Sequence, residues 1–383
     1  MQPNLISCGY QHAGGEGDGQ RTPAKLETGV MIMKIRNGFS LSECVVVVAI
    51  VGLLIAILMP MLGASRMRMR GQTSAEKLML IGQAGMMYAN DNADRLFTYS
   101  WRAGETYTMP DGRRKTGSDD QAAAANQNTE ILQRLTGRVT GQFKINSFNT
   151  RLPHRRYSHL VLMDYLGLPT NTELFIDPSD GKQQVWTANP LEYGFGSSVP
   201  YATGIPAGYD ADPNWGSAPV RQRWAFASSY QMVPDAWQED SGPRYIPIAD
   251  TPHLFQGGAG IQLGRRKVTD VLHNANKVWM HEEFDRDRVQ HLYFGYDEAR
   301  TEKLMFDGSV NSWESGRAAP SVVPERGLFH WRQTYVPLDR FPLPVGGIFD
   351  PTLVSQRFRW TYGGLSGINY GSFSGARGAR VRP

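Results

Sequence analysis

The chain has 383 residues, of which 41% are hydrophobic and 20% charged, and its mean hydropathy of −0.39 excludes a multi-pass membrane protein. With 9 Trp, 16 Tyr and 16 Phe it has enough apolar surface to exclude a chain that is disordered throughout. Its 40 Lys and Arg against 36 Asp and Glu leave a net charge of +4, too small for the field of a nucleic-acid-binding protein. Its two cysteines, Cys8 and Cys44, can build neither a disulfide framework nor a Cys-based zinc site.

One apolar segment stands apart from the rest of the chain. Residues 39–62 read FSLSECVVVVAIVGLLIAILMPML, in which 19 of 24 residues are apolar and Glu43 is the only charge. As a helix, residues 45–62 would span about 27 Å, close to the roughly 30 Å hydrocarbon layer of a bilayer. The alternatives are a buried core helix or a cleaved secretory signal peptide, but the residues around Pro60 and Leu62 lack the small side chains of a signal-peptidase site. The segment therefore predicts one membrane-spanning helix that stays in the mature protein.

Glu43, the only charged residue of this segment, indicates what the segment does. A carboxylate inside a membrane helix costs a few kcal/mol unless it is paired, so it needs a partner or a function. The residues before the span read MKIRNG, a short basic stretch, and Gly38-Phe39 opens the apolar run. This arrangement resembles the type IV pilins and type II secretion pseudopilins. Counted from Phe39, Glu43 and Pro60 fall at mature positions five and twenty-two, where that family has its acidic residue and often a helix-bending proline.

The resemblance implies a processing pathway and an assembly role. A prepilin peptidase would cut after Gly38 on the cytoplasmic side and methylate the new amine of Phe39. In a filament, the Glu43 carboxylate would pair with that amine of a neighbouring subunit, and Pro60 would bend the helix. Residues 1–38 would be the leader, unless translation starts at Met31 or Met33. The implied location is the bacterial inner membrane, crossed once, with a cytoplasmic N-terminus and an exported C-terminal domain.

Two features depart from the family pattern. Ser42 and Cys44 flank Glu43 where the family usually has large aliphatic residues, which lowers hydrophobicity beside the cleavage site. Basic residues after the span outnumber those before it, so a plain positive-inside count leaves the orientation ambiguous or reversed. We retain the N-inside orientation because pilin-like proteins commonly have basic residues just beyond the span, where these continue the first helix.

The first helix is expected to continue beyond the membrane through residues 63–92. Leu78, Ile81, Gly85 and Tyr88 share one helical face, and Asn90-Asp91-Asn92 ends the pattern. Residues 93–383 would form the exported domain. Within it, residues 99–156 are polar and Gly-rich and are expected to form a long loop or an insertion.

Further elements follow in the exported domain. The apolar pattern predicts a helix at Tyr157–Leu166, stopped by Gly167, and a hairpin at Lys303–Trp313 around Asp307-Gly308. Predicted strands cover Trp224–Met232, Lys277–His281 and Gln290–Phe294. The phrases ELFIDPSD, FDGSVN and YGGLSGINYG resemble segments of the large pilin-like proteins of planctomycete-type bacteria. The expected fold is α+β and pilin-like: a long N-terminal helix, half of it transmembrane, packed on an antiparallel sheet with enlarged loops.

Candidate chemical sites are weak. Ser74-Ala75-Glu76-Lys77 matches the SxxK pattern of penicillin-binding proteins, but the companion motifs fail on order and spacing. His281-Glu282-Glu283 lacks the second histidine of a zinc site. Calcium is the one metal considered, because some pseudopilins hold it in a C-terminal loop; its candidate ligands are Asp285, Asp287 and Asp297, or Asp177 and Asp180. The tail arginines Arg377, Arg380 and Arg382 could touch DNA or an anionic polysaccharide, although a solvated terminus is the simpler interpretation.

We therefore expect a structural subunit of a pseudopilus or of a type IV pilus-like filament. The large region after residue 92 favours a minor or tip component. Expected partners are the prepilin peptidase, other pilin or pseudopilin subunits, the inner-membrane assembly platform and the lipid bilayer, with no cofactor, no catalytic residue and no nucleic acid. The alternative hypotheses are an anchored binding protein, such as an adhesin or DNA-uptake pilin, and an anchored enzyme.

Overall fold

The structure is a computed structural model of the chain and describes residues 40–141, 144–145, 157–188, 226–237, 239–240, 245–248, 251–257, 262–282, 284–286, 292, 294–319, 357–359, 361 and 363–371. The chain divides into two compact units, Met1–Leu58 and Met59–Pro383. Helix α1 (Leu41–Asp91) contributes residues to both units. The predicted processing residues Gly38 and Phe39, and the start codons considered at Met31 and Met33, lie outside the described residues.

The first unit contains the apolar beginning of α1. The most apolar 18-residue stretch of this helix has a mean hydropathy of 3.1 and none of it is buried. Large side chains such as Val48, Leu53 and Leu58 are exposed along it. The protein thus has one N-terminal helix that is long and apolar enough to cross a membrane.

In the second unit the later turns of α1 form part of a hydrophobic core. Leu78, Ile81, Gly85 and Tyr88 are all buried, as their spacing predicts. An added Cβ at Gly85 would lie 2.5 Å from Cη2 of Trp279, and one at Gly82 would lie 2.8 Å from Cδ1 of Leu304. Gly85 therefore has no room for a larger residue, because the rigid ring of Trp279 packs directly on the helix backbone there.

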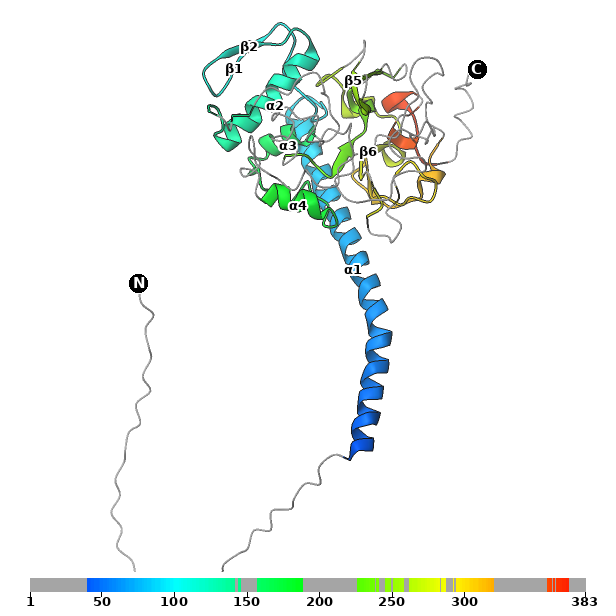
Figure 1. Ribbon diagram of the computed structural model, residues 1–383. Coiled ribbons are helices and arrows are strands. Elements are labelled where there is room, and N and C mark those ends of the chain that lie inside the picture. The colour runs from blue at the N-terminus through cyan, green and yellow to red at the C-terminus, as the bar shows by residue number, and fades with distance from the viewer. Residues whose placement is uncertain are drawn as a thin grey trace, which may run out of the picture. The chain divides into compact units, whose positions relative to one another are not determined.

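Those side chains come from a four-stranded antiparallel sheet. Its strands are β3 (Tyr230–Met232), β6 (Val278–Glu282), β7 (Lys303–Met305) and β8 (Val310–Asn311), in the order β3-β6-β7-β8. Gln231 pairs with His281, which in turn pairs with Lys303. Figure 1 shows the last turns of α1 with α3 and α4 on one side and β6 on the other. The expected α+β class with an antiparallel sheet is present.

The predicted strands and hairpin are confirmed in part. The hairpin turns at Asp307-Gly308, where Gly308 has φ +86° and Asp307 accepts a bond from the Ser309 amide. The prediction at 277–281 corresponds to β6. Within the prediction at 224–232, the described residues 226–229 lie in no strand and Tyr230–Met232 form β3. In the prediction at 290–294, Leu292 and Phe294 are described and lie in no strand.

The described residues of 99–156 are not one long loop, which was the first of our two expectations for this region. They contain a hairpin of β1 (Thr106–Thr108) and β2 (Arg114–Thr116), followed by the 17-residue helix α2 (Asp120–Thr136). Asp119 caps α2 by accepting from the Ala122 amide, and Gly137 ends it in a left-handed conformation at φ 68°. The four alanines of this segment have high helix propensity, and the helix is capped at both ends. These local signals outweigh the polar composition of the segment.

The remaining elements are short. Helix α3 (His159–Tyr165) lies inside the predicted helix and is followed by Gly167 at φ 64°. Helix α4 (Gly181–Ala188) follows the ELFIDPSD segment. Strands β4 (Tyr245–Ile248) and β5 (Thr251–Gly257) form a separate antiparallel pair.

The close approach of the sheet to α1 generates a first prediction. Gly85→Ala should lower the free energy of unfolding of the second unit by about 1–3 kcal/mol, because the added methyl group overpacks against Trp279. Denaturant unfolding of the full chain in detergent micelles, followed by tryptophan fluorescence, measures this loss. Gly63→Ala is the matched control, since a Cβ there meets nothing within 4 Å. Equal stability of the two variants would contradict the packing described.

Candidate functional site

The first turn of α1 contains a reciprocal hydrogen-bond pair around Glu43. The Glu43 carboxylate accepts from the Ser40 amide at 2.7 Å and from the Ser40 hydroxyl at 2.8 Å, while Ser40 Oγ accepts from the Glu43 amide at 3.3 Å. This is a capping box, which satisfies amides that a helix N-terminus otherwise leaves unpaired. The Ser-x-x-Glu spacing of residues 40–43 is a local signal for this capping box. Glu43 therefore caps its own helix, whatever else it contacts.

Pro60 lies inside α1, and the helix is assigned without interruption on both sides of it. Because proline has no amide hydrogen, this turn lacks one backbone hydrogen bond. The predicted bend remains a prediction.

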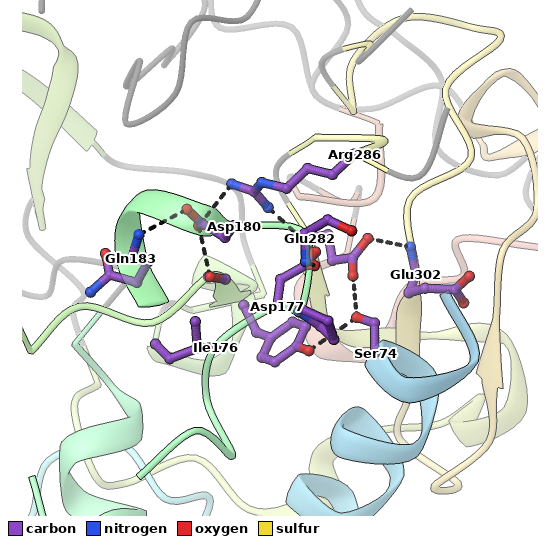
Figure 2. Close-up of polar contacts among 12 residues, drawn as sticks. Ser74, Ile176, Asp177, Asp180, Gln183, Glu282, Arg286 and Glu302 are labelled. Carbon is purple, nitrogen blue, oxygen red and sulfur yellow. Dashed lines mark hydrogen bonds and ion pairs between the residues drawn. The ribbon is translucent and has the colours of Figure 1, made fainter. Parts of the chain in front are cut away.

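In the second unit, polar side chains from α1, β3 and β6 come together. Ser74 of α1 donates a hydrogen bond to Oε1 of Glu282 in β6 and lies 3.0 Å from the Tyr230 hydroxyl of β3. A serine hydroxyl has one hydrogen, so the Tyr230 hydroxyl is the donor to Ser74. The amide of Glu302 donates to Oε2 of Glu282 at 3.1 Å. Figure 2 shows Ser74 directed at the Glu282 carboxyl, which ties α1 to the sheet.

The ELFIDPSD segment supplies two further carboxyls to this cluster. Asp177 accepts from the Ser179 amide at 2.6 Å, and Asp180 accepts from the Ser229 hydroxyl at 2.7 Å. The Arg286 guanidinium lies 3.2 Å from Asp180 and 3.6 Å from Asp177 (Figure 2). We call Ser74, Asp177, Asp180, Tyr230, Glu282 and Arg286 the junction cluster; each is buried.

Burial shifts the protonation of two members of the junction cluster. The pKa of Glu282 is raised well above its usual value, first by burial and then by the charges of Asp177 and Glu302 and a hydrogen bond with Asp177. The pKa of Tyr230 is also raised well above its usual value, by burial and by the nearby Asp177 and Glu282. The cluster therefore favours neutral forms of both groups.

Lys77, the lysine of the SxxK pattern, has a structural role. Its Nζ donates to the backbone carbonyls of Glu173 at 2.8 Å and Ile176 at 2.9 Å. The Ser74 hydroxyl is fully buried and already bonded to Glu282 and Tyr230. Both side chains thus join α1 to its surroundings, an arrangement unlike a serine nucleophile with its lysine base.

The calcium candidates that the structure describes bond to other residues. Asp285 accepts from the Arg300 amide at 3.0 Å, Asp297 pairs with Arg357, and Asp287 lies outside the described residues. Asp177 and Asp180 instead belong to the junction cluster. Within the described part of the chain, no group of three or more His, Cys, Asp or Glu side chains is arranged to hold a metal ion. The tail arginines lie beyond the last described residue.

A groove of about 470 Å³ runs beside α1 next to the junction cluster. The α1 side of the groove includes Ala64, Arg68, Gly71 and Ala75. Its other wall includes Glu282, Asp285, Arg300 and Glu302. Sequence reasoning could not anticipate this groove, because its walls come from segments more than 200 residues apart.

Comparisons with family models, with curated proteins and with solved structures found no match for this chain. Its function must therefore be argued from its own residues.

Buried Lys303 generates a second prediction. Burial lowers the pKa of Lys303 to about 7, and its Nζ donates to the carbonyls of Thr301 and Trp313 at 2.6 and 2.7 Å. An unfolded lysine titrates near 10.4, so between these values the unfolded chain binds the extra proton and stability should rise with pH. Within this range, Lys303 should lower the unfolding equilibrium constant by about tenfold for each pH unit. Lys303→Met should remove that contribution.

The measurement is denaturant unfolding of the full chain at several pH values above 7. Buried Lys277, whose pKa is also lowered by burial, contributes in the same direction, so the rise should shrink and not vanish. An unchanged pH slope in Lys303→Met would contradict the assignment.

Proposed function

We propose that this chain is a membrane-anchored, pilin-like structural subunit that assembles with other subunits through α1. The observation that supports this proposal most is the composition of that helix. The same 51-residue helix contains a stretch apolar enough to cross a membrane and a later stretch that is buried in the core of the second unit. A helix with an apolar stretch and a buried stretch can anchor a domain in a membrane and also form part of the core of that domain.

The sequence around the start of α1 supports the same proposal. Gly38-Phe39 precedes the helix, and Glu43 lies in its first turn. In this proposal, a prepilin peptidase removes residues 1–38, Phe39 becomes the methylated N-terminus, and the remaining chain crosses the bacterial inner membrane once with its C-terminal region exported.

The later turns of α1 also expose apolar side chains. Met69, Leu80 and Met87 are 55%, 53% and 58% exposed, and Met79 and Met86 are exposed as well. At about 100° per residue, Met69, Leu80 and Met87 lie on the side of the helix opposite the buried Leu78, Ile81 and Gly85. An exposed apolar helix face favours packing against another helix. We propose that α1 of a neighbouring subunit covers it, as part of a pseudopilus or pilus-like filament in which this chain is a minor or tip component.

A pair of substitutions tests the role of Glu43. Glu43→Ala removes both the capping box and the carboxylate proposed to pair with a neighbour, whereas Ser40→Ala removes the capping hydroxyl alone. In a host with prepilin peptidase and an assembly machine, we expect Glu43→Ala to reduce incorporation into filaments severely and Ser40→Ala to reduce it little. Immunoblots of sheared filaments measure incorporation.

Mass spectrometry of the N-terminus accompanies this experiment, with methylated Phe39 expected in the wild type and in both variants. Equal incorporation of the two variants would show that Glu43 acts only as a helix cap and would contradict its proposed role in assembly. Residues N-terminal to Phe39 still attached in the wild type would overturn the pilin-like assignment itself.

A further inference from the structure

Three arginines follow the apolar stretch of α1, and the proposed assembly does not use them. Between Glu43 and Glu76, the only charged residues of the chain are Arg66, Arg68 and Arg70. All three are exposed on the helix. Within the part of the chain that the structure describes, no hydrogen bond or ion pair involves their side chains. Their charges are therefore available to a ligand outside the chain.

The position of Arg68 places its charge near a bilayer surface. Arg68 lies six residues beyond Leu62, the end of the apolar segment, which is about 9 Å along the helix. Side chains on a helix tilt toward its N-terminus, so the long arginine side chain reaches back toward the apolar segment. The headgroup layer is about 5–8 Å thick on each side of the hydrocarbon. With α1 crossing a membrane, which this step takes from the proposed function, the Arg68 guanidinium lies at the level of the lipid phosphates.

Arg68 differs from the other two arginines because it lines the groove beside α1. Arg66 and Arg70 lie about 200° away from it around the helix and face another side. The small residues Gly71 and Ala75 also line the groove. Its volume of about 470 Å³ falls within the range of about 300–1,000 Å³ that is typical of small-molecule sites.

The opposite wall of the groove contains both a cation and a carboxylate. Arg300 is exposed and bonds to Glu314 through Nε and Nη2, which leaves further N–H groups of its guanidinium for a ligand. Glu302 is partly exposed, whereas the other two acidic residues of the lining, Glu282 and Asp285, are buried. The groove thus presents two guanidinium groups and one accessible carboxylate to the same space.

We propose that this groove binds the headgroup of a phospholipid that has both a phosphate and a primary ammonium group, as phosphatidylethanolamine does. The phosphate binds between Arg68 and Arg300, because guanidinium groups donate paired hydrogen bonds to phosphate oxygens. The ammonium group donates to the Glu302 carboxylate. The acyl chains then lie along the exposed apolar residues that precede the groove, such as Met59 and Leu62.

The charges of the groove select this headgroup over the other common ones. A phosphatidylglycerol headgroup is anionic and has no cation for Glu302, so its phosphate would lie near an uncompensated carboxylate. A phosphatidylcholine headgroup has a cation, but its trimethylated nitrogen has no hydrogen to donate. The ethanolamine headgroup alone combines the phosphate that the arginines bind with a hydrogen-bond donor for Glu302.

The first test uses the full-length wild type and depends on no variant. Dioleoyl phosphatidylethanolamine, phosphatidylcholine or phosphatidylglycerol is added to the chain in detergent micelles, and native mass spectrometry counts the lipid molecules that each chain retains. We expect one retained phosphatidylethanolamine, with a Kd about tenfold lower than that of either other lipid, as the loss of one charge-assisted hydrogen bond predicts. Equal retention of the three lipids would overturn the proposal.

Three substitutions then test the contacts within the groove. Arg68→Gln should weaken the binding of phosphatidylethanolamine and of phosphatidylcholine by about tenfold, because both lipids contain the phosphate. Glu302→Gln should weaken the binding of phosphatidylethanolamine alone, to the level of phosphatidylcholine. Arg70→Gln is the matched control, since it removes the same charge from another side of α1, and it should leave both affinities unchanged. Equal losses in Arg68→Gln and Arg70→Gln would show that charge near the membrane matters and not the groove, which would overturn the proposal.

Two further measurements separate this proposal from its neighbours. Soluble glycerophosphoethanolamine, which has the headgroup without acyl chains, should bind far more weakly than the lipid; equal affinity would overturn the proposal in favour of a site for a free phosphoethanolamine compound. Flotation with vesicles of phosphatidylethanolamine and phosphatidylcholine measures membrane anchoring itself. A chain that does not float would contradict the proposed function as well, whereas a chain that floats and retains the three lipids equally would contradict the lipid site alone.

Discussion

The contact between α1 and the sheet at Gly82 and Gly85 is the constraint on which the second unit depends. Trp279 approaches the helix backbone so closely that Gly85 has no room for a Cβ, and Leu304 packs against Gly82. Such an approach fixes the helix relative to β6 and β7, and the fully buried Trp279 stacks on Phe306 behind it. The glycines weaken the helix itself, and the buried aromatic surface offsets that loss.

Polar bonds then fix the same helix at its entry into the core. Ser74 and Lys77, one turn apart, bond to β6 and to the ELFIDPSD segment respectively. Buried polar bonds of this kind add little net stability but exclude other packings, because a misplaced helix would remove the Ser74 hydroxyl from Glu282 and Tyr230. The apolar and polar contacts together leave the opposite side of α1, with Leu80 and Met87, facing solvent.

The sequence predicts those elements whose signals are local. The face of α1 from Leu78 to Tyr88, helix α3 and the hairpin at Asp307-Gly308 follow from residue spacing and turn chemistry. Helix α2 lies in a segment whose polar composition predicts a loop, but its alanine run and its caps at Asp119 and Gly137 stabilise a helix. The junction cluster could not be predicted, because Ser74 and Glu282 are 208 residues apart and only the fold brings them together. The capping box at Ser40 was available in the sequence, since its spacing is entirely local.

We propose that α1 packs on the sheet with one face and on other subunits with the opposite face. Cysteine cross-linking in membranes tests it most directly, in a chain whose Cys8 and Cys44 are replaced by serine. Leu80→Cys places a thiol on the exposed face of α1, whereas Asp307→Cys places one on an exposed turn away from it. The account predicts that mild oxidation links copies of the chain rapidly through position 80 and slowly through position 307. Equal rates at the two positions would indicate random collision and contradict assembly through α1.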